Sequence, residues 1–327
     1  MIVRISPVLI VLRLVTGLIM MAYCLGHMMN HALGIVSIET MDQVRAQFIG
    51  FWRAPGIYWV TPVAIVVHLV AAVTLLMHKR TMKMMDRMAK FQVGLGMLLP
   101  LLLCVHIGYS RGAFTQTGKD LYYSNFFYTM HEAGGLLGLL LYVTLLTSLV
   151  WGHGCLGMHR WLKVKAWYKK YWNFWYLMAV LPPCLSLFGS LSAYRETVIR
   201  IEDPTWVAQL DEQNQWKGWT NADGLPYEQA DIDAVIGPII VQLLGAFFFT
   251  VAMGVLIRLI WLRLEKKKAT VELVFSSGEQ IKVSPGTSLL EASQLAGISQ
   301  ASVCGGHGRC STCRVRILVG NENLAPP

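Results

Sequence analysis

Six long apolar stretches constrain this chain more than any other feature of its sequence. They occupy about residues 8–33, 56–78, 91–110, 129–153, 172–193 and 236–262. A helix needs about 20 mostly apolar residues to cross the hydrocarbon core of a bilayer. Only 14% of the 327 residues are charged, against about 25% in soluble domains. We therefore predict an all-α polytopic membrane bundle of six transmembrane helices. The first stretch is too long for a cleaved signal peptide, so we expect it to be retained.

The distribution of charge predicts how this bundle is oriented. Basic residues gather after the second, fourth and sixth stretches, whereas the loop 194–235 is mostly acidic. The basic residues are Lys79, Arg80, Lys83, Arg87 and Lys90; Arg160, Lys163, Lys165, Lys169 and Lys170; and Arg263, Lys266, Lys267 and Lys268. By the positive-inside rule, both termini are cytoplasmic, and the loop 194–235 is a cap on the other side. We expect the mixed segment 39–52 to form an interfacial helix. Because the net charge of +9 forms no single patch, the sequence argues against nucleic-acid binding.

Four histidines lie in the first four apolar stretches, one in each: His27, His68, His106 and His153. Ionisable side chains within a membrane are costly and therefore mark function. For any one of these histidines alone, a hydrogen bond between helices is an equally good explanation. Four on successive helices instead predict two b haems, each with two axial imidazoles. His31, one turn after His27, and His131, at the start of the fourth stretch, are alternative ligands.

Depth along the helices indicates how these four histidines pair. At about 1.5 Å per residue, His27 and His106 both fall in the outer half of the membrane. His153 falls at the cytoplasmic end of its stretch, and His68 lies near the middle. Depth therefore favours His27 with His106 and leaves His68 with His153.

A cysteine motif follows the last apolar stretch. Cys304, Cys310 and Cys313 have the spacing C-x5-C-x2-C, with glycines between them. Alternating residues around Gly278 predict a hairpin, and Ser288 begins a capped helix. This pattern favours a [2Fe-2S] cluster over a zinc site. No fourth cysteine follows before Pro327, so we expect a truncated α+β, ferredoxin-like (β-grasp) domain. We then expect the cluster to be absent or unstable in this form, and an effector to follow. We place the anchor at 1–265 and the ferredoxin part at 269–327.

The segments around the four histidines resemble a known family. Gly17-Leu18-Ile19 with Gly26-His27-Met28, then His68-Leu69, Val105-His106-Ile107 and His153-Gly154 with Gly157 and Arg160, are similar to the dihaem cytochrome b of succinate dehydrogenases and fumarate reductases. The family's ligand order implies the same two pairs. The chain departs from that family by having six stretches where five are common.

A six-helix haem anchor followed by a ferredoxin resembles the N-terminal half of alphaproteobacterial class III adenylate cyclases. That resemblance implies a dimeric redox sensor in the bacterial inner membrane, which responds to haem or quinone and controls conversion of ATP to cAMP. No residue of this chain is expected to carry cyclase catalysis. One alternative is an electron-transfer cytochrome b subunit of a quinone-linked oxidoreductase, and another is a haem-stabilised anchor.

Two further groups of residues have both a functional and a structural interpretation. Candidate quinone ligands, or anchors of the loops, are Tyr109, Arg111, His131 and Glu132. Six small residues would admit a flat macrocycle or simply let helices pack closely. They are Gly26, Gly94, Gly96, Gly134, Gly135 and Gly138.

Overall fold

The computed structural model describes residues 7–77, 85–117, 122–214, 229–265, 270–303, 306 and 310–323. The helices are α1 (Pro7–Ala32), α2 (Ile38–Trp52), α3 (Val60–Met77), α4 (Arg87–Ile107), α5 (Ala113–Thr117), α6 (Tyr123–Leu162), α7 (Ala166–Lys170), α8 (Trp172–Arg200), α9 (Pro204–Asn214), α10 (Gln229–Glu265) and α11 (Leu289–Leu295). The strands are β1 (Val271–Val274) and β2 (Gln280–Val283). Short 3-10 turns are η1 (Leu33–Ile35) and η4 (Asn321–Asn323), and η2 (Gly108–Gly112) is a π-helical turn.

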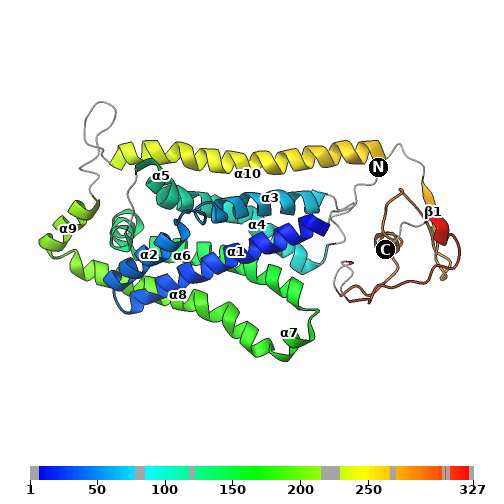
Figure 1. Ribbon diagram of the computed structural model, residues 1–327, viewed down its shortest axis with the longest axis horizontal. Helices are drawn as coiled ribbons and strands as arrows, with labels where there is room; N and C mark the ends of the chain where they lie inside the picture. The colour runs from blue at the N-terminus through cyan, green and yellow to red at the C-terminus, as the bar shows by residue number, and fades with distance from the viewer. Residues whose placement is uncertain are drawn as a thin grey trace.

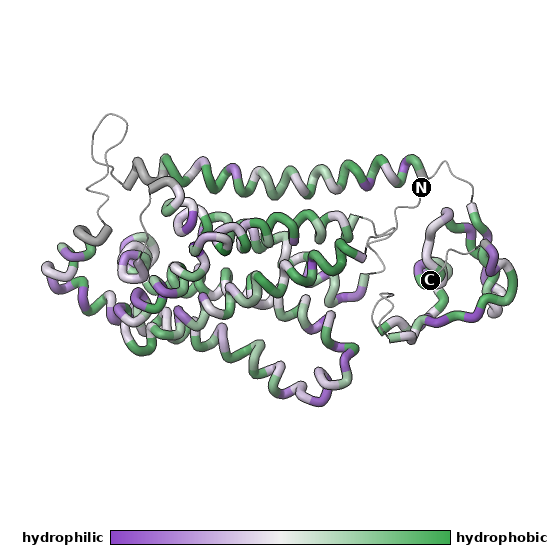
Figure 2. Tube along the Cα trace, in the orientation of Figure 1, coloured by the Kyte–Doolittle hydropathy of each residue, from purple (hydrophilic) through white to green (hydrophobic). Residues whose placement is uncertain are grey.

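Among the residues that the structure describes, six segments are long and apolar enough to cross a membrane, as predicted. They are Pro7–Ile35, Val60–Met77, Arg87–Thr115, Tyr123–Leu162, Trp172–Arg200 and Ala234–Leu264. Apolar residues run along these helices, and hydrophilic residues gather at their ends (Figure 2). Large apolar side chains such as Val241 and Phe249 are exposed on α10. Outward-facing apolar surface of this kind is suited to lipid, because only lipid makes its exposure favourable.

Four helices, α1, α3, α4 and α6, form the centre of the bundle (Figure 1). On one side α8 packs against α1 and α6, and on the other α10 packs against α3 and α4. At Gly34 in η1 and Gly189 in α8, the backbone at the end of α1 comes close to that of α8. A Cβ on Gly189 would lie 2.8 Å from Cα of Ala32. Glycine on both sides is therefore what allows this crossing.

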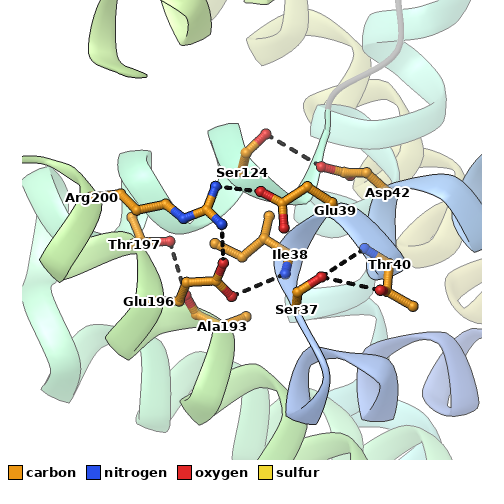
Figure 3. Close-up of polar contacts among 10 residues, drawn as sticks. All are labelled: Ser37, Ile38, Glu39, Thr40, Asp42, Ser124, Ala193, Glu196, Thr197 and Arg200. Carbon is orange, nitrogen blue, oxygen red and sulfur yellow. Dashed lines mark hydrogen bonds and ion pairs between the residues drawn. The ribbon is translucent and has the colours of Figure 1, made fainter. Parts of the chain in front are cut away.

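The helix α2 covers one end of the bundle, where the sequence predicted an interfacial helix. Glu196 on α8 accepts a hydrogen bond from the Ile38 amide at 3.1 Å, and Arg200 joins Glu196 to Glu39 (Figure 3). Burial works to raise the pKa of Glu39, but the hydrogen bonds from its own backbone and from Arg200 outweigh it and leave that pKa below its usual range. Beneath α2 lies a buried core that contains Met41, Phe127 and Leu139. The contacts of Glu196 and Arg200 thus tie α2 to α8.

Two expected boundaries were wrong. Residues 194–235 were expected to be a loop, but α8 continues to Arg200, α9 follows, and α10 begins at Gln229. The continuation of α8 is explained by the contacts that Glu196 and Arg200 make with α2. His153 was expected at the end of its helix, but α6 continues to Leu162. Arg160 in this extension donates to Gln92 Oε1 at 3.0 Å, which stabilises the added turns.

The C-terminal part contains the predicted hairpin and capped helix. β1 pairs with β2 in antiparallel register, with Val271 opposite Val283. Gly278 in the turn has a φ of 98°, a conformation that favours glycine. Ser288 and Glu291 form a capping box at the start of α11. The described residues thus form a small α and β unit after the helical bundle, in agreement with the predicted fold class.

Candidate functional site

The structure brings the four predicted histidines together as two pairs. His27 on α1 faces His106 on α4, with ring centroids 5.8 Å apart and planes inclined by 59°. His68 on α3 faces His153 on α6, with centroids 6.4 Å apart and planes inclined by 76°. We call these the outer pair and the inner pair. They are the pairs that depth favoured, and each joins two helices of the central four.

The spacing of each pair fits a metal held between two opposed imidazoles. With a metal–nitrogen bond of about 2 Å on each side, the two ring centroids must lie about 6 Å apart. Packed aromatic rings can have the same separation, so the histidine donor set matters as much as the distance. Both pairs therefore have the donor set and the separation that a bis-histidine haem requires, and their role as ligands stays a prediction.

The inner pair is held by main-chain carbonyls. His68 Nδ1 lies 3.0 Å from the Arg13 oxygen, and His153 Nδ1 lies 3.0 Å from the Gln92 oxygen. A carbonyl can only accept, so Nδ1 carries the proton in both rings and Nε2 keeps its lone pair. Metal-binding histidines typically use their second nitrogen in this way, because the bond fixes the tautomer and the ring orientation.

The outer pair has different surroundings. His106 Nδ1 lies 3.2 Å from the Tyr142 hydroxyl. His27 lies between aromatic rings, with the centroid of Tyr23 at 6.2 Å and that of Phe48 at 6.4 Å. Gly26 leaves room for Phe48, since a Cβ there would lie 2.6 Å from its ring. The aromatic packing over His27 thus comes partly from α2.

The two alternative ligands have partners outside the pairs. His31 lies edge-on to His27 at 4.8 Å, and its Nδ1 is 3.1 Å from Ser190 Oγ on α8. His131 Nδ1 is 3.1 Å from the Tyr194 hydroxyl, also on α8. Both histidines connect helices, which is the structural role that the sequence left open for a membrane histidine.

The candidate quinone ligands have separate partners in the structure. Arg111 donates to the Tyr58 carbonyl at 2.9 Å and lies over the Tyr58 ring at 4.2 Å. Glu132 is exposed, and Tyr109 is 38% exposed. The contacts of Arg111 fit the loop-anchoring interpretation.

The predicted small residues have different environments. A Cβ on Gly96 would lie 2.9 Å from the His153 ring, whereas Gly94, Gly134 and Gly138 have nothing within 4 Å of such an atom. Gly135 has a φ of 58° and interrupts the regular helix of α6.

Sequence reasoning missed Tyr142 and Ser190 as partners of histidines, because nothing in the sequence shows which neighbour a hydroxyl on a helix will contact.

The cysteine loop is only partly described. Cys310 and Cys313 are partly buried thiols, and Cys304 lies outside the described residues. Gln300 Nε2 donates to the Cys313 carbonyl at 3.0 Å, and Thr312 Oγ1 accepts from the Val303 amide at 3.0 Å. These bonds hold the loop around Cys310 and Cys313. Cys24, Cys104, Cys155 and Cys184 are free thiols in the helices, as expected for packing residues.

Comparison with known proteins identifies the C-terminal part. Residues 274–326 match the family model for the 2Fe-2S iron-sulfur cluster binding domain. The chain is 37% identical over 87 residues to one subunit of the Na(+)-translocating NADH-quinone reductase of Idiomarina loihiensis, which covers 25% of this chain and 21% of that protein. It is 35% identical over 89 residues to the equivalent protein of Methylococcus capsulatus, covering 26% and 21% of the two chains.

A shorter match is to 2Fe-2S ferredoxin-5 of Aquifex aeolicus, 57% identical over 30 residues, or 9% of this chain and 31% of that protein. The chain spans about a fifth of the length of the two reductase subunits. No solved structure matches it. The prediction of a 2Fe-2S ferredoxin-type domain is confirmed, and it follows a bundle of membrane-type helices.

Proposed function

We propose that the bundle holds two b haems, one between His27 and His106 and one between His68 and His153, and connects a membrane reductant to the [2Fe-2S] domain. The observation that carries the proposal is the separation of the two histidine pairs, 5.8 Å and 6.4 Å between centroids. Four histidines in four apolar helices would be costly without such a use.

The residues of the bundle support this proposal in three ways. The carbonyls of Arg13 and Gln92 keep Nε2 of the inner histidines unprotonated. Apolar helices surrounded by lipid would keep water away from both pairs. His68 packs against Gly17 of α1, and the outer ligand His27 lies further along the same helix, about 15 Å away. A bound b haem supplies a one-electron redox couple, so two such sites form a route along the bundle.

Resemblance to the haem-anchored adenylate cyclases supports a sensing output. A quinol that is oxidised gives up two electrons and two protons, and one-electron sites can take those electrons singly. A change of redox state would then bias the end of α10, at Arg263, and a dimeric cyclase beyond the ferredoxin domain. Sensing requires two states whose energies depend on redox state. If reduction of the haems left cAMP synthesis by the full-length protein unchanged, the sensing output would be wrong.

A second candidate is a cytochrome b subunit of a quinone-linked oxidoreductase. The similarity of the chain to part of an NADH-quinone reductase favours it. In that case the ferredoxin domain passes electrons onward and no effector responds. Quinol-dependent reduction of a soluble electron acceptor, with no redox effect on cAMP, would favour this candidate over sensing.

The test of the shared proposal is the absorption spectrum of the purified protein, with haem counted per chain. We expect b-type bands and two haems per chain. His153→Ala should leave one, and His27→Ala should also leave one. His31→Ala and His131→Ala are matched controls that should keep both. Because the planes of the inner pair are inclined by 76°, its ferric form should give a highly anisotropic low-spin EPR signal. A chain without haem would overturn the proposal.

A further inference from the structure

The helices α1 and α4 carry the same arrangement of three residues. In each helix a glycine follows, by four residues, the residue whose carbonyl binds an inner histidine: Gly17 after Arg13, and Gly96 after Gln92. In each helix an outer histidine then follows the glycine by ten residues, as His27 and as His106. The remaining histidines, His68 and His153, come from the helices packed against them, α3 and α6.

The four central helices thus form two pairs that carry their proposed ligands at the same intervals. The pair α1 and α3 supplies one ligand to each proposed site, and the pair α4 and α6 supplies the other. Each site therefore joins the two halves rather than lying within one of them.

The glycines lie where an imidazole must pass to reach the carbonyl. In a helix, the carbonyl of residue i points toward the amide of residue i+4, so a ring that approaches it lies against residue i+4. A Cβ on Gly17 would be 3.3 Å from Cε1 of His68, and a Cβ on Gly96 would be 2.9 Å from Cε1 of His153. Both glycines therefore leave space for a histidine of the neighbouring helix.

Resting on the proposed function, we infer that Gly17 and Gly96 are positioning residues of the inner haem site. Each lets one inner imidazole lie on the helix backbone, donate from Nδ1 to a carbonyl and direct Nε2 toward the opposite ring. In the outer pair, His106 binds the Tyr142 hydroxyl instead of a main-chain carbonyl. Substitution of either glycine should therefore affect the inner site and spare the outer one.

Substitution of Gly96 should disturb the inner site more than substitution of Gly17. The 2.9 Å approach at Gly96 forces His153 to move, whereas the 3.3 Å approach at Gly17 requires a shift of only a few tenths of an ångström by His68. Gly94 offers a matched control, since it lies on the same helix as Gly96 but is exposed on the outside of the helix bundle, with nothing within 4 Å of an added Cβ.

The experiment compares Gly96→Ala, Gly17→Ala and Gly94→Ala by haem content, ferric EPR and midpoint potential, with the inner signal assigned as the one lost in His153→Ala. We expect Gly96→Ala to lose the inner haem or to change its EPR signal and potential, with the outer signal unchanged. Gly17→Ala should keep both haems and show a smaller change at the inner site. Gly94→Ala should match the wild-type protein.

The outcomes separate this inference from the proposed function. A wild-type protein without haem would overturn both. If wild-type binds two haems and the inner signal and potential of Gly96→Ala equal those of Gly94→Ala, the inference alone is wrong. If Gly96→Ala does not accumulate in membranes, Gly17→Ala decides, because its smaller clash is compatible with folding. An inner site unchanged in Gly17→Ala would then overturn the inference.

Discussion

At the scale of single residues, Asp42 shows how one carboxylate can fix the start of a membrane helix. Its Oδ1 accepts a hydrogen bond from the Tyr123 amide at 2.7 Å, and its Oδ2 accepts one from the Ser124 hydroxyl at 3.3 Å. The Tyr123 amide is an orphan donor at the first turn of α6. Burial raises the pKa of Asp42, although the Tyr123 amide works in the opposite direction. The hydrogen bonds to Asp42 therefore stabilise the start of α6, whereas burial of its negative charge costs free energy.

Asp42→Asn and Asp42→Ala separate these two effects. Because the folded pKa is raised, wild-type stability should fall as pH rises from about 4 through that pKa, since the unfolded chain releases the proton first. Asn keeps an acceptor oxygen without charge, so its stability should change less with pH. Ala removes the cap and should cost about 1 kcal/mol at neutral pH. Thermal unfolding in detergent between pH 4 and 8 measures both. Equal stability of the two variants would contradict the capping role.

The same scale shows which parts of the histidine site the sequence could predict. The pairing of His27 with His106 followed from depth, because the rise of a helix per residue is regular. The partners of Nδ1 did not follow, because they depend on how each helix is rotated about its axis. An almost uniformly apolar stretch carries no polar face that would indicate this rotation. The carbonyls of Arg13 and Gln92 were therefore beyond prediction.

At the scale of elements, the six membrane-type helices were predictable and some of their ends were not. Length and hydropathy locate a helix core, but the ends depend on neighbours. Contacts with Gln92 extend α6, and contacts with α2 extend α8. The crossing of α1 and α8 likewise depends on two distant glycines, Gly34 and Gly189. No local pattern marks Gly189 as a contact residue.

Gly189→Ala should destabilise the protein through this crossing. The added Cβ would meet the backbone of α1, with Cα of Ala32 only 2.8 Å away, so the helices must separate. Overpacking of this kind costs about 1–3 kcal/mol, and the contact of His31 with Ser190 should be lost. Gly237→Ala is the control, because nothing lies within 4 Å of a Cβ there. Thermal unfolding measures the difference, and equal midpoints for the two variants would show that the crossing tolerates a methyl group.

At the scale of the whole molecule, the two ends of the bundle are chemically distinct. Figure 1 places α7 and the C-terminal domain at one end, and α2 and α9 at the other. The basic residues Lys169 and Lys170 belong to α7. By the positive-inside rule, we expect the end with α7 and the ferredoxin domain to be cytoplasmic. The inner pair would then be the one nearer the ferredoxin domain, as an electron route to that domain requires.

Thiol labelling of intact cells tests this orientation. Gln209 on α9 and Lys169 on α7 are both exposed, so Gln209→Cys and Lys169→Cys should fold as the wild type does. We expect a membrane-impermeant maleimide to label Gln209→Cys in intact cells and to label Lys169→Cys only after permeabilisation. The wild-type protein, which carries only the native cysteines, measures the background labelling before and after permeabilisation. Labelling of Lys169→Cys alone in intact cells would reverse the orientation, and the outer pair would then lie on the cytoplasmic side.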